Sequence, residues 1–233
     1  MIAVTGGKGS PGCTFVSVGL ARCLAASGLE TLLLDADAEA PSVAAWLDLP
    51  PTAEAFARAL EHGAVGGQAM RDLATPSAGG LRALEVTAAG VDGRELTGHA
   101  RDSHEAVVVD LGHCLGPLQR QLLAAADWVV WVAVPDRLGV DRADRALAAA
   151  PRGADGGLIA NRCGRGRLRG AEQLLAAAHG LPLLARIPDR PDKARALLER
   201  RAPAHGRGPF AAPIREAART VHPDCGARVT AWP

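Results

Sequence analysis

The stretch Gly7-Lys8-Gly9-Ser10-Pro11-Gly12-Cys13-Thr14 decides the fold of this 233-residue chain. It follows a short apolar segment, Ile2–Thr5, that has the pattern of a buried strand, and it leads into a helical pattern that begins near Gly12. A strand, a glycine-rich turn and a helix N-terminus together form an anion site, because free backbone N–H groups converge there and the helix dipole favours negative charge. The stretch therefore predicts a loop that holds phosphate.

One position of this loop departs from the usual pattern G-x-x-x-x-G-K-[ST]. In that pattern the lysine reaches the β- and γ-phosphates, and the hydroxyl group binds magnesium. Gly7 and Gly12 keep the spacing and Thr14 keeps the hydroxyl, but Cys13 stands where the lysine belongs. Lys8 lies near the start of the loop, in a chain whose 26 basic residues are almost all arginines. The alternative interpretation is an ordinary Gly/Ser/Pro turn.

Short apolar runs alternate with helical patterns along the rest of the chain. The predicted strands are Ile2–Thr5, Thr31–Asp35, Leu81–Val86, Ala106–Asp110, Trp128–Val134, Gly157–Asn161 and Leu183–Ile187. The predicted helices are Cys13–Ser27, Pro41–Leu47, Thr52–His62, Arg94–Asp102, Pro117–Ala125, Val140–Ala149, Leu168–His179 and Asp192–Arg200. This alternation predicts an α/β fold with a doubly wound, mostly parallel sheet flanked by helices, whose ligands bind beyond the carboxyl ends of the strands.

The length fits one large domain, which we place at residues 1–200, followed by a C-terminal helix and irregular tail at 201–233. Prolines and glycines from Arg201 onward indicate irregular chain, except that Phe210–Val221 has the pattern of a short helix packed on the domain. The Gly/Ala-rich segment Ala64–Gly80 has the composition of a surface connection.

Composition excludes several classes of protein. A net charge of +1 predicts neither strong non-specific nucleic-acid binding nor an acidic partner. Five cysteines without paired spacing argue against a disulfide framework and a CxxC zinc site. Met1 opens directly into the first predicted strand, which leaves no room for a signal peptide, and no apolar run approaches the roughly 18–20 residues of a membrane span. These features predict a cytoplasmic protein without a transmembrane segment.

The loop resembles the deviant Walker A motif, K-G-G-x-G-K-[ST], of the MinD/ParA family of P-loop ATPases. Lys8 matches the signature lysine, which in this family contacts the phosphates of the partner subunit in a nucleotide-sandwiched dimer. Gly9 and Gly12 match two of the glycines, whereas Ser10 replaces a glycine and Cys13 replaces the second lysine. The small residue at that last position resembles the CpaE/TadZ-like pilus-assembly subgroup.

The resemblance covers about Met1 to Arg200 and implies ATP and Mg²⁺ as cofactors and a homodimer as the assembly. It assigns nucleotide binding to the loop residues Gly7, Gly9, Ser10, Pro11, Gly12, Cys13 and Thr14.

Aspartates follow two of the predicted strands. In the family, the segment Asp35-Ala36-Asp37 corresponds to the first switch, so Asp37 would position the hydrolytic water and Asp35 would lie nearer the magnesium shell with Thr14. Asp110 ends an apolar strand in the Walker B pattern, whose carboxylate binds magnesium. Alternatively, Asp37 or Ser42 caps the helix that begins at Pro41.

Two later strand ends complete the implied site. Asn161 corresponds to the asparagine that reads the adenine edge, and Pro188 and Asp189 match a segment that lines the base pocket. The loop Arg162–Arg169 carries four arginines and either contacts DNA phosphate or is solvated.

Other residues near the predicted site leave alternatives open. His113 is either a polar switch residue or a solvent-facing loop histidine. Cys13, at a helix N-terminus, is either a small neutral replacement for lysine or an unusually reactive thiol, because a helix N-terminus lowers a thiol pKa. The helix Phe210–Val221 lacks the character of a membrane anchor.

The leading hypothesis is an ATP–Mg-binding dimer with weak or absent hydrolysis that acts in the positioning or assembly of a pilus, secretion or partition machine. Its catalytic residues would be Lys8 and Asp37. The alternatives are a nucleotide-independent adaptor and a relative of biosynthetic ligases or metal-centre maturation factors, for which the sequence shows no convincing ligand cluster.

Overall fold

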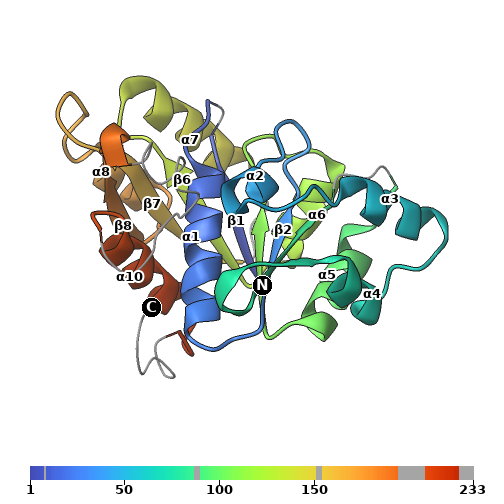
Figure 1. The fold of residues 1–233 in the computed structure, drawn as a ribbon. Coiled ribbons are helices and arrows are strands. Elements are labelled where there is room, and N and C mark those ends of the chain that lie inside the picture. Colours follow the sequence, from blue (N-terminus) through green and yellow to red (C-terminus); the bar gives the residue numbers. More distant parts are fainter. Residues whose placement is uncertain (8, 87–89, 151–153, 194–207, 226–233) are drawn as a thin grey trace.

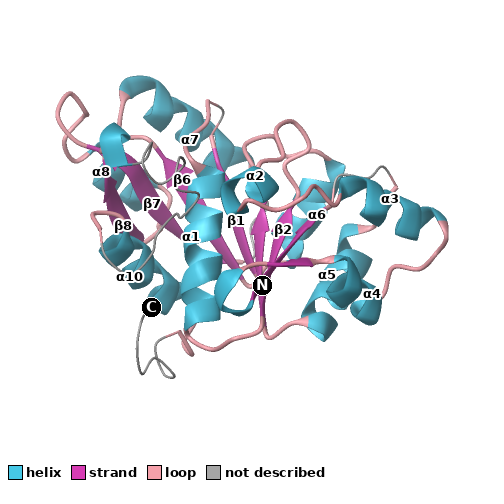
Figure 2. Cartoon of the chain, in the orientation of Figure 1, coloured by secondary structure: helices cyan, strands magenta, loops and turns pink. Residues whose placement is uncertain are grey.

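The computed structural model describes residues 1–7, 9–86, 90–150, 154–193 and 208–225. Its centre is an eight-stranded sheet with the strand order β3-β4-β2-β5-β1-β6-β7-β8. All neighbouring strands run parallel except β3, which pairs antiparallel with β4 at one edge. Helices cover both faces of this sheet (Figure 1), and Figure 2 shows the fan of strands between them. The predicted fold class is confirmed.

The bounds of the elements are as follows. The strands are β1 Ile2–Gly6, β2 Thr31–Asp35, β3 Thr75–Pro76, β4 Leu81–Glu85, β5 Ala106–Asp110, β6 Trp128–Ala133, β7 Asp155–Cys163 and β8 Leu183–Pro188. The helices are α1 Cys13–Ala26, α2 Val43–Leu47, α3 Ala53–Glu61, α4 Gly67–Leu73, α5 Gly93–Ser103, α6 Pro117–Ala125, α7 Arg137–Ala149, α8 Ala171–Ala178 and α10 Ala211–Val221, with a short 3₁₀ turn at Ala78–Gly80.

The sheet separates two apolar clusters. One cluster packs α1, α2 and α10 against one face, and the other packs helices α3 to α8 against the opposite face. Strands β1, β2 and β5 are buried along their whole length, because helices cover both of their sides. This double burial explains why the central strands appear in the sequence as unbroken apolar runs.

The segment Ala64–Gly80 is not the surface connection that its composition indicates. It contains the helix α4 and the edge strand β3. Met70 is fully buried in the second cluster, Leu73 packs partly buried against it, and the other residues of the helix are exposed or half-buried. A short helix with so few apolar contacts leaves no clear periodic pattern in the sequence.

The C-terminal helix α10 packs on α1 and β8, as predicted. The contact is close, because a Cβ atom on Gly19 would lie only 3.0 Å from the Ile214 side chain. Of the predicted helix Asp192–Arg200, residues 194–200 lie outside the described part of the chain, although the described residues just before them are helical. None of the described helices combines the length and apolar character needed to cross a membrane.

Candidate functional site

The loop between β1 and α1 passes so close to its neighbours that several positions accept only glycine. A Cβ atom on Gly7 would lie 2.6 Å from the backbone carbonyl carbon of Arg142 on α7. Gly12 has a left-handed backbone, with φ +99°, and a Cβ atom there would lie 2.3 Å from the side-chain nitrogen of Asn161. These approaches fix the path of the loop.

Helix α1 begins immediately after this loop with its N-terminal amides exposed to the site. Its N-cap residue is Gly12, no side chain caps the first turn, and the first turn contains no acidic residue. The first amides of a helix have no partner inside the helix, and they attract anions when no side chain satisfies them. The start of α1 is therefore suited to phosphate.

A cavity of about 690 Å³ opens beyond the carboxyl ends of the strands. Its walls come from the loop and the start of α1, from the segments after β2 and β5, and from the ends of β7 and β8. Predicted residues from distant parts of the sequence meet here, among them Thr14, Asp37, Asn161 and Pro188. The volume lies within the range of small-molecule sites.

Two aspartates stand side by side on neighbouring strands, because the parallel register pairs Asp35 with Asp110. Oδ1 of Asp110 accepts a hydrogen bond from the Gly112 amide at 3.2 Å. Its buried Oδ2 has no hydrogen-bond partner among the described residues, and the nearby Thr14 hydroxyl lies 3.1 Å from the hydroxyl of Ser42. Burial raises the pKa of Asp110 to about 7, while the Thr14 hydroxyl lowers it and Asp35 raises it further.

An unsatisfied carboxylate oxygen beside a hydroxyl is a donor set that suits Mg²⁺, which prefers oxygen ligands. The residues present, Asp110 and Thr14, therefore fit the magnesium ion that the resemblance implies.

Asp35 holds the first switch segment through backbone contacts. Its Oδ2 accepts hydrogen bonds from the amides of Ser42 and Val43, both at 2.8 Å, and its Oδ1 accepts one from Asp37 at 3.2 Å. Burial raises the pKa of Asp35 to about 6, although these amides lower it. Asp35 thus supports the start of α2. The predicted capping by Asp37 or Ser42 is wrong, because neither side chain caps that helix.

Asp37 closes a turn and contacts the segment that follows β5. Its Oδ1 accepts hydrogen bonds from the amides of Glu39 and Ala40 at 3.1 and 3.2 Å. Gly112 has φ +61°, and a Cβ atom on it would lie 2.3 Å from the Asp37 carboxyl carbon. The segments that follow β2 and β5 are therefore packed against each other beside the cavity.

Cys13 is a neutral group in this site. Its side chain is buried, with a residue exposure of 5%. Burial, followed by the carboxylates of Asp110 and Asp37, raises its pKa well above the usual value. These causes outweigh the backbone contribution at the start of α1, so the structure favours a neutral thiol over an unusually reactive one.

Asn161 ties the phosphate-binding loop to β7. Its side-chain amide donates to the Pro11 carbonyl oxygen at 2.7 Å and accepts from the Arg162 amide at 2.9 Å. The sequence predicts contact with adenine for this amide, and the structure adds a supporting role for the loop.

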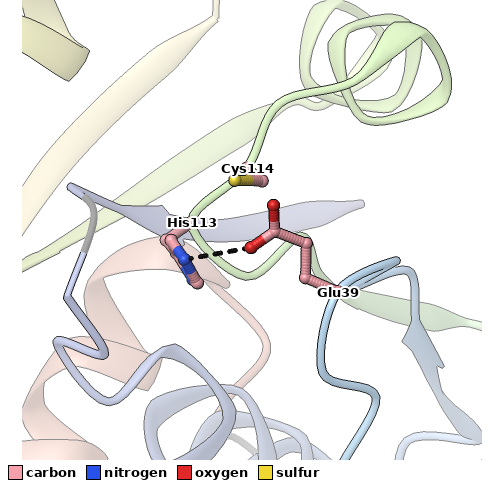
Figure 3. Close-up of side chains that lie close together, drawn as sticks. All are labelled: Glu39, His113 and Cys114. Carbon is pink, nitrogen blue, oxygen red and sulfur yellow. Dashed lines mark ion pairs between the residues drawn. The ribbon is translucent and has the colours of Figure 1, made fainter.

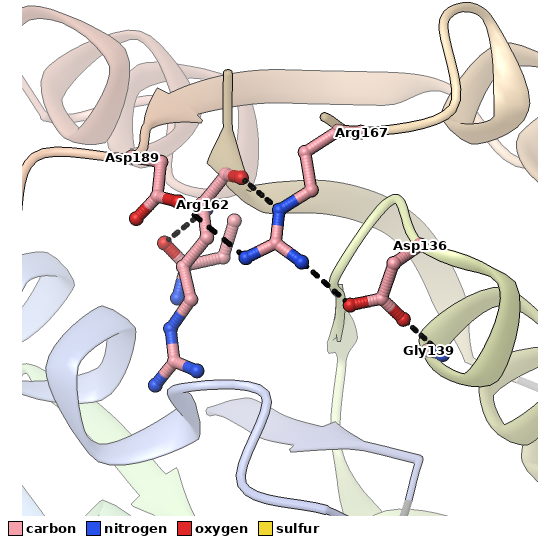
Figure 4. A network of polar contacts seen from close by, with 6 residues as sticks. Asp136, Gly139, Arg162, Arg167 and Asp189 are labelled. Atoms are coloured by element: carbon pink, nitrogen blue, oxygen red, sulfur yellow. Dashed lines mark hydrogen bonds and ion pairs between the residues drawn. The ribbon is translucent and has the colours of Figure 1, made fainter. Parts of the chain in front are cut away.

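The arginine-rich loop is partly engaged within the protein (Figure 4). Arg167 pairs with Asp136 at 2.7 Å and with Asp189 at 3.4 Å. The side chain of Arg162 extends away from this network, lines the cavity, and belongs to a residue with a left-handed backbone, φ +57°. These ion pairs remove part of the charge that DNA phosphate would require.

Arg142 is a site residue that the sequence did not reveal. Its guanidinium lies against the loop, because a Cβ atom on Gly9 would be 2.2 Å from Nη1. Arg142 makes no ion pair or hydrogen bond with the other described residues. No local motif distinguishes it from other helical arginines. Lys8 lies outside the described residues, so its role stays a prediction.

The fold and the site together define a P-loop type of nucleotide-binding protein, with a phosphate loop at the first strand–helix junction and carboxylates at neighbouring strand ends. Residues 2–204 match the family described as the CobQ/CobB/MinD/ParA nucleotide binding domain, and the chain belongs to this family.

Solved structures show the same fold at low sequence identity. The septum site-determining protein MinD from Pyrococcus horikoshii OT3, complexed with Mg-ADP, is 18% identical with a TM-score of 0.75, covering 99% of this chain and 100% of that one. MinD from Aquifex aeolicus is 20% identical with a TM-score of 0.73, covering 94% of each chain. Apo McdA from Cyanothece is 16% identical with a TM-score of 0.74, covering 95% of this chain and 99% of that one. No curated protein sequence matches significantly.

Proposed function

We propose that this protein binds ATP with Mg²⁺ in the cavity at the carboxyl ends of the strands. The observation that carries the proposal is the uncapped start of α1, which faces this cavity beside the unsatisfied Oδ2 of Asp110. An amide cluster that favours anions and a buried oxygen that favours a cation lie together, and a magnesium-bound triphosphate meets both requirements.

The roles follow the position of each segment around the cavity. Backbone amides of the loop would hold the phosphates, through Gly7, Gly9, Ser10, Pro11, Gly12, Cys13 and Thr14. Thr14 and Asp110 would hold the magnesium ion, with Asp35 keeping the first switch segment beside it. Bound magnesium would neutralise charge on the phosphate oxygens.

Asp37 would orient a water molecule near the terminal phosphate, and Asn161, Pro188 and Asp189 would form the base pocket. Asp37 and the base-pocket residues line the cavity, which supports these assignments.

The positive charge at the loop differs from that of an ordinary P-loop. Cys13 is neutral, whereas the guanidinium of Arg142 lies beside Gly9. Together with Lys8 from a second copy, Arg142 would supply part of the missing charge. Loss of one transition-state donor costs about 10²–10³ in rate, so we infer slow or absent hydrolysis.

We further propose a nucleotide-sandwiched homodimer of the deviant Walker A type that acts in the cytoplasm with a pilus, secretion or partition machine, in the manner of CpaE/TadZ-like proteins. The solved neighbours support nucleotide binding and partner binding in general, since their titles name a MinD complexed with Mg-ADP, an McdA(D38A)–ATP complex and a MinC:MinD complex. DNA is a weaker candidate partner, because Arg167 is already paired.

Calorimetry and thermal shift with ATP–Mg test the proposal. We expect measurable heat and a raised melting temperature, and we expect Asp110→Asn to remove the dependence on Mg²⁺ while the fold is retained. The second candidate is a nucleotide-independent adaptor, which the neutral, buried Cys13 favours. Neither heat nor a thermal shift at millimolar nucleotide would establish the adaptor and refute ATP binding.

A further inference from the structure

Three side chains of metal-binding type lie close together (Figure 3), and one of them, His113, lines the cavity. Glu39, His113 and Cys114 each present one ligand atom, and these atoms all lie within 4.8 Å of one another. Nε2 of His113 is 3.4 Å from Oε2 of Glu39. This is the one group of this kind among the described residues, and the family resemblance gives it no role.

The backbone beneath the cluster is held in place by several contacts. On one side, the Glu39 amide donates to the carboxylate of Asp37, which packs against Gly112. On the other side, the Gly112 amide donates to Asp110 and its carbonyl oxygen accepts from the Thr5 hydroxyl at 3.0 Å. The three ligating side chains therefore extend from two loops that the sheet already fixes next to each other.

The chemistry of the set selects a particular kind of metal. A thiolate, an imidazole and a carboxylate suit Zn²⁺ and similar transition metals, whereas Mg²⁺ takes oxygen ligands and keeps several waters. Tetrahedral zinc with bonds of 2.0 to 2.3 Å places its ligand atoms about 3.5 Å apart. The ligand atoms of the three residues lie at most 4.8 Å from one another. A movement of about 1 Å by these side chains, which rotation about their χ angles can supply, would bring the atoms to zinc-binding distance.

Exposure of the cluster also fits a bound ion. The His113 side chain is 17% exposed and the Glu39 side chain is 56% exposed, so the imidazole is positioned by its surroundings while the carboxylate is free to turn toward an ion. His113 lines the cavity, which leaves an open direction for a water molecule as fourth ligand.

We propose that Glu39, His113 and Cys114 bind one transition-metal ion of the Zn²⁺ class, which joins the first switch segment to the segment after β5. Glu39 belongs to one loop and the other two ligands belong to the second, so the ion cross-links them. Such an ion restricts the separation of the two segments that flank the proposed nucleotide site. Binding of the ion itself requires no nucleotide.

The competing explanation is a simple ion pair between Glu39 and His113, with Cys114 nearby by coincidence. The two explanations differ in the part played by the thiol. A metal site needs the sulfur as a ligand, whereas an ion pair does not.

The test uses the untagged full chain, treated with a chelator and free of nucleotide. We expect calorimetry with Zn²⁺ to give one ion per chain, and Co²⁺ to give the absorption band of a thiolate ligand. Cys114→Ser is expected to abolish that band and to weaken Zn²⁺ binding by at least about tenfold. Substitution of a residue that only hydrogen-bonds to a metal ligand already lowers metal affinity by about 10- to 100-fold. His113→Ala is expected to weaken binding similarly.

Cys163→Ser is the matched control, because Cys163 is also a half-buried thiol but lies at the end of β7, outside the cluster. It should bind both metals like the natural protein, and excess Mg²⁺ should not compete. Absence of zinc binding, or unchanged binding and an unchanged cobalt band in a folded Cys114→Ser protein, would overturn the proposal. Zinc binding without any ATP binding would refute the proposed function and leave the metal site standing.

Discussion

Restoring the lysine at the end of the phosphate-binding loop, by Cys13→Lys, should convert a weak nucleotide site into a stronger one. Cys13 lies at the first position of α1, and the carboxylates of Asp110 and Asp37 are close enough to raise its pKa. An ammonium group there reaches toward both carboxylates and toward the cavity that Cys13 lines.

The magnitude follows from the contact that the lysine would make. A hydrogen bond to a charged group contributes about 1.5–3 kcal/mol, which corresponds to about 10- to 150-fold tighter binding. The site is buried, and in the nucleotide-free protein the new ammonium already pairs with the carboxylates. Both effects reduce the gain, so we expect about tenfold tighter ATP–Mg binding and up to about 10²–10³ faster hydrolysis.

Calorimetry gives the affinity and phosphate release gives the turnover, each measured beside Cys13→Met. Methionine fills similar space without a charge, so it separates electrostatics from packing. The same pair of variants should be measured without Mg²⁺, where only the lysine variant is expected to keep measurable ATP binding. If Cys13→Lys binds ATP–Mg no more tightly than Cys13→Met, the reasoning that charge limits this site is refuted.

Three further perturbations test other parts of the structure. Arg142→Ala should weaken ATP–Mg binding by about 3- to 10-fold by calorimetry, as expected for one partly exposed charge. Arg145→Ala is the control, because the Arg145 guanidinium pairs with a neighbour on the same helix, and it should leave the affinity unchanged. Equal effects of the two substitutions would exclude a special role for Arg142. Gly12→Ala should cost about 1–3 kcal/mol in urea unfolding and remove the nucleotide-induced thermal shift. Gly63→Ala, which also has a positive φ but open space around it, should cost only about 1 kcal/mol, so similar losses would contradict the clash at Gly12. Burial lowers the pKa of His104 below its usual value of 6.5, so as the pH falls the unfolded chain takes up a proton before the folded protein does. The melting temperature should therefore decrease as the pH drops below 6.5. His104→Gln should remove this decrease, and an unchanged pH dependence in that variant would assign it to another group.

The fold was predictable because the central strands are covered on both faces. Double burial produces apolar runs that end sharply at polar residues, as in Ala106–Asp110, and parallel connection brings those ends to one edge. The short edge strand β3 and the helix α4 left no such signal. Met70 is the one fully buried side chain of α4 and only Leu73 packs beside it, which is too few apolar positions to show a helical period.

The candidate site was predictable where a residue ends a strand, and unpredictable where a contact joins two loops. Asp35 and Asp110 were identified by their position at strand ends. The hydrogen bonds that Asp35 accepts from backbone amides depend on how the segment after β2 folds back over its carboxylate. Arg142 reaches the phosphate loop only because Gly7 lets α7 approach so closely. Glu39 and His113 are far apart in sequence, so their meeting depends on the contact between Asp37 and Gly112.

If the protein binds ATP–Mg²⁺ as proposed, the electrostatics of its site favour a cation that arrives with the nucleotide. Burial raises the pKa of both Asp110 and Asp35, so charge on these carboxylates is costly when no cation is near. An ordinary P-loop supplies a lysine at the position of Cys13, whereas this chain places a neutral thiol there. Arg142 lies against the loop at Gly9 but does not line the cavity, so it would supply only part of the missing charge. A divalent ion bound with the phosphates would therefore be the main counter-charge for the aspartates, which makes nucleotide and metal binding more strongly coupled here than in a loop that has its own lysine.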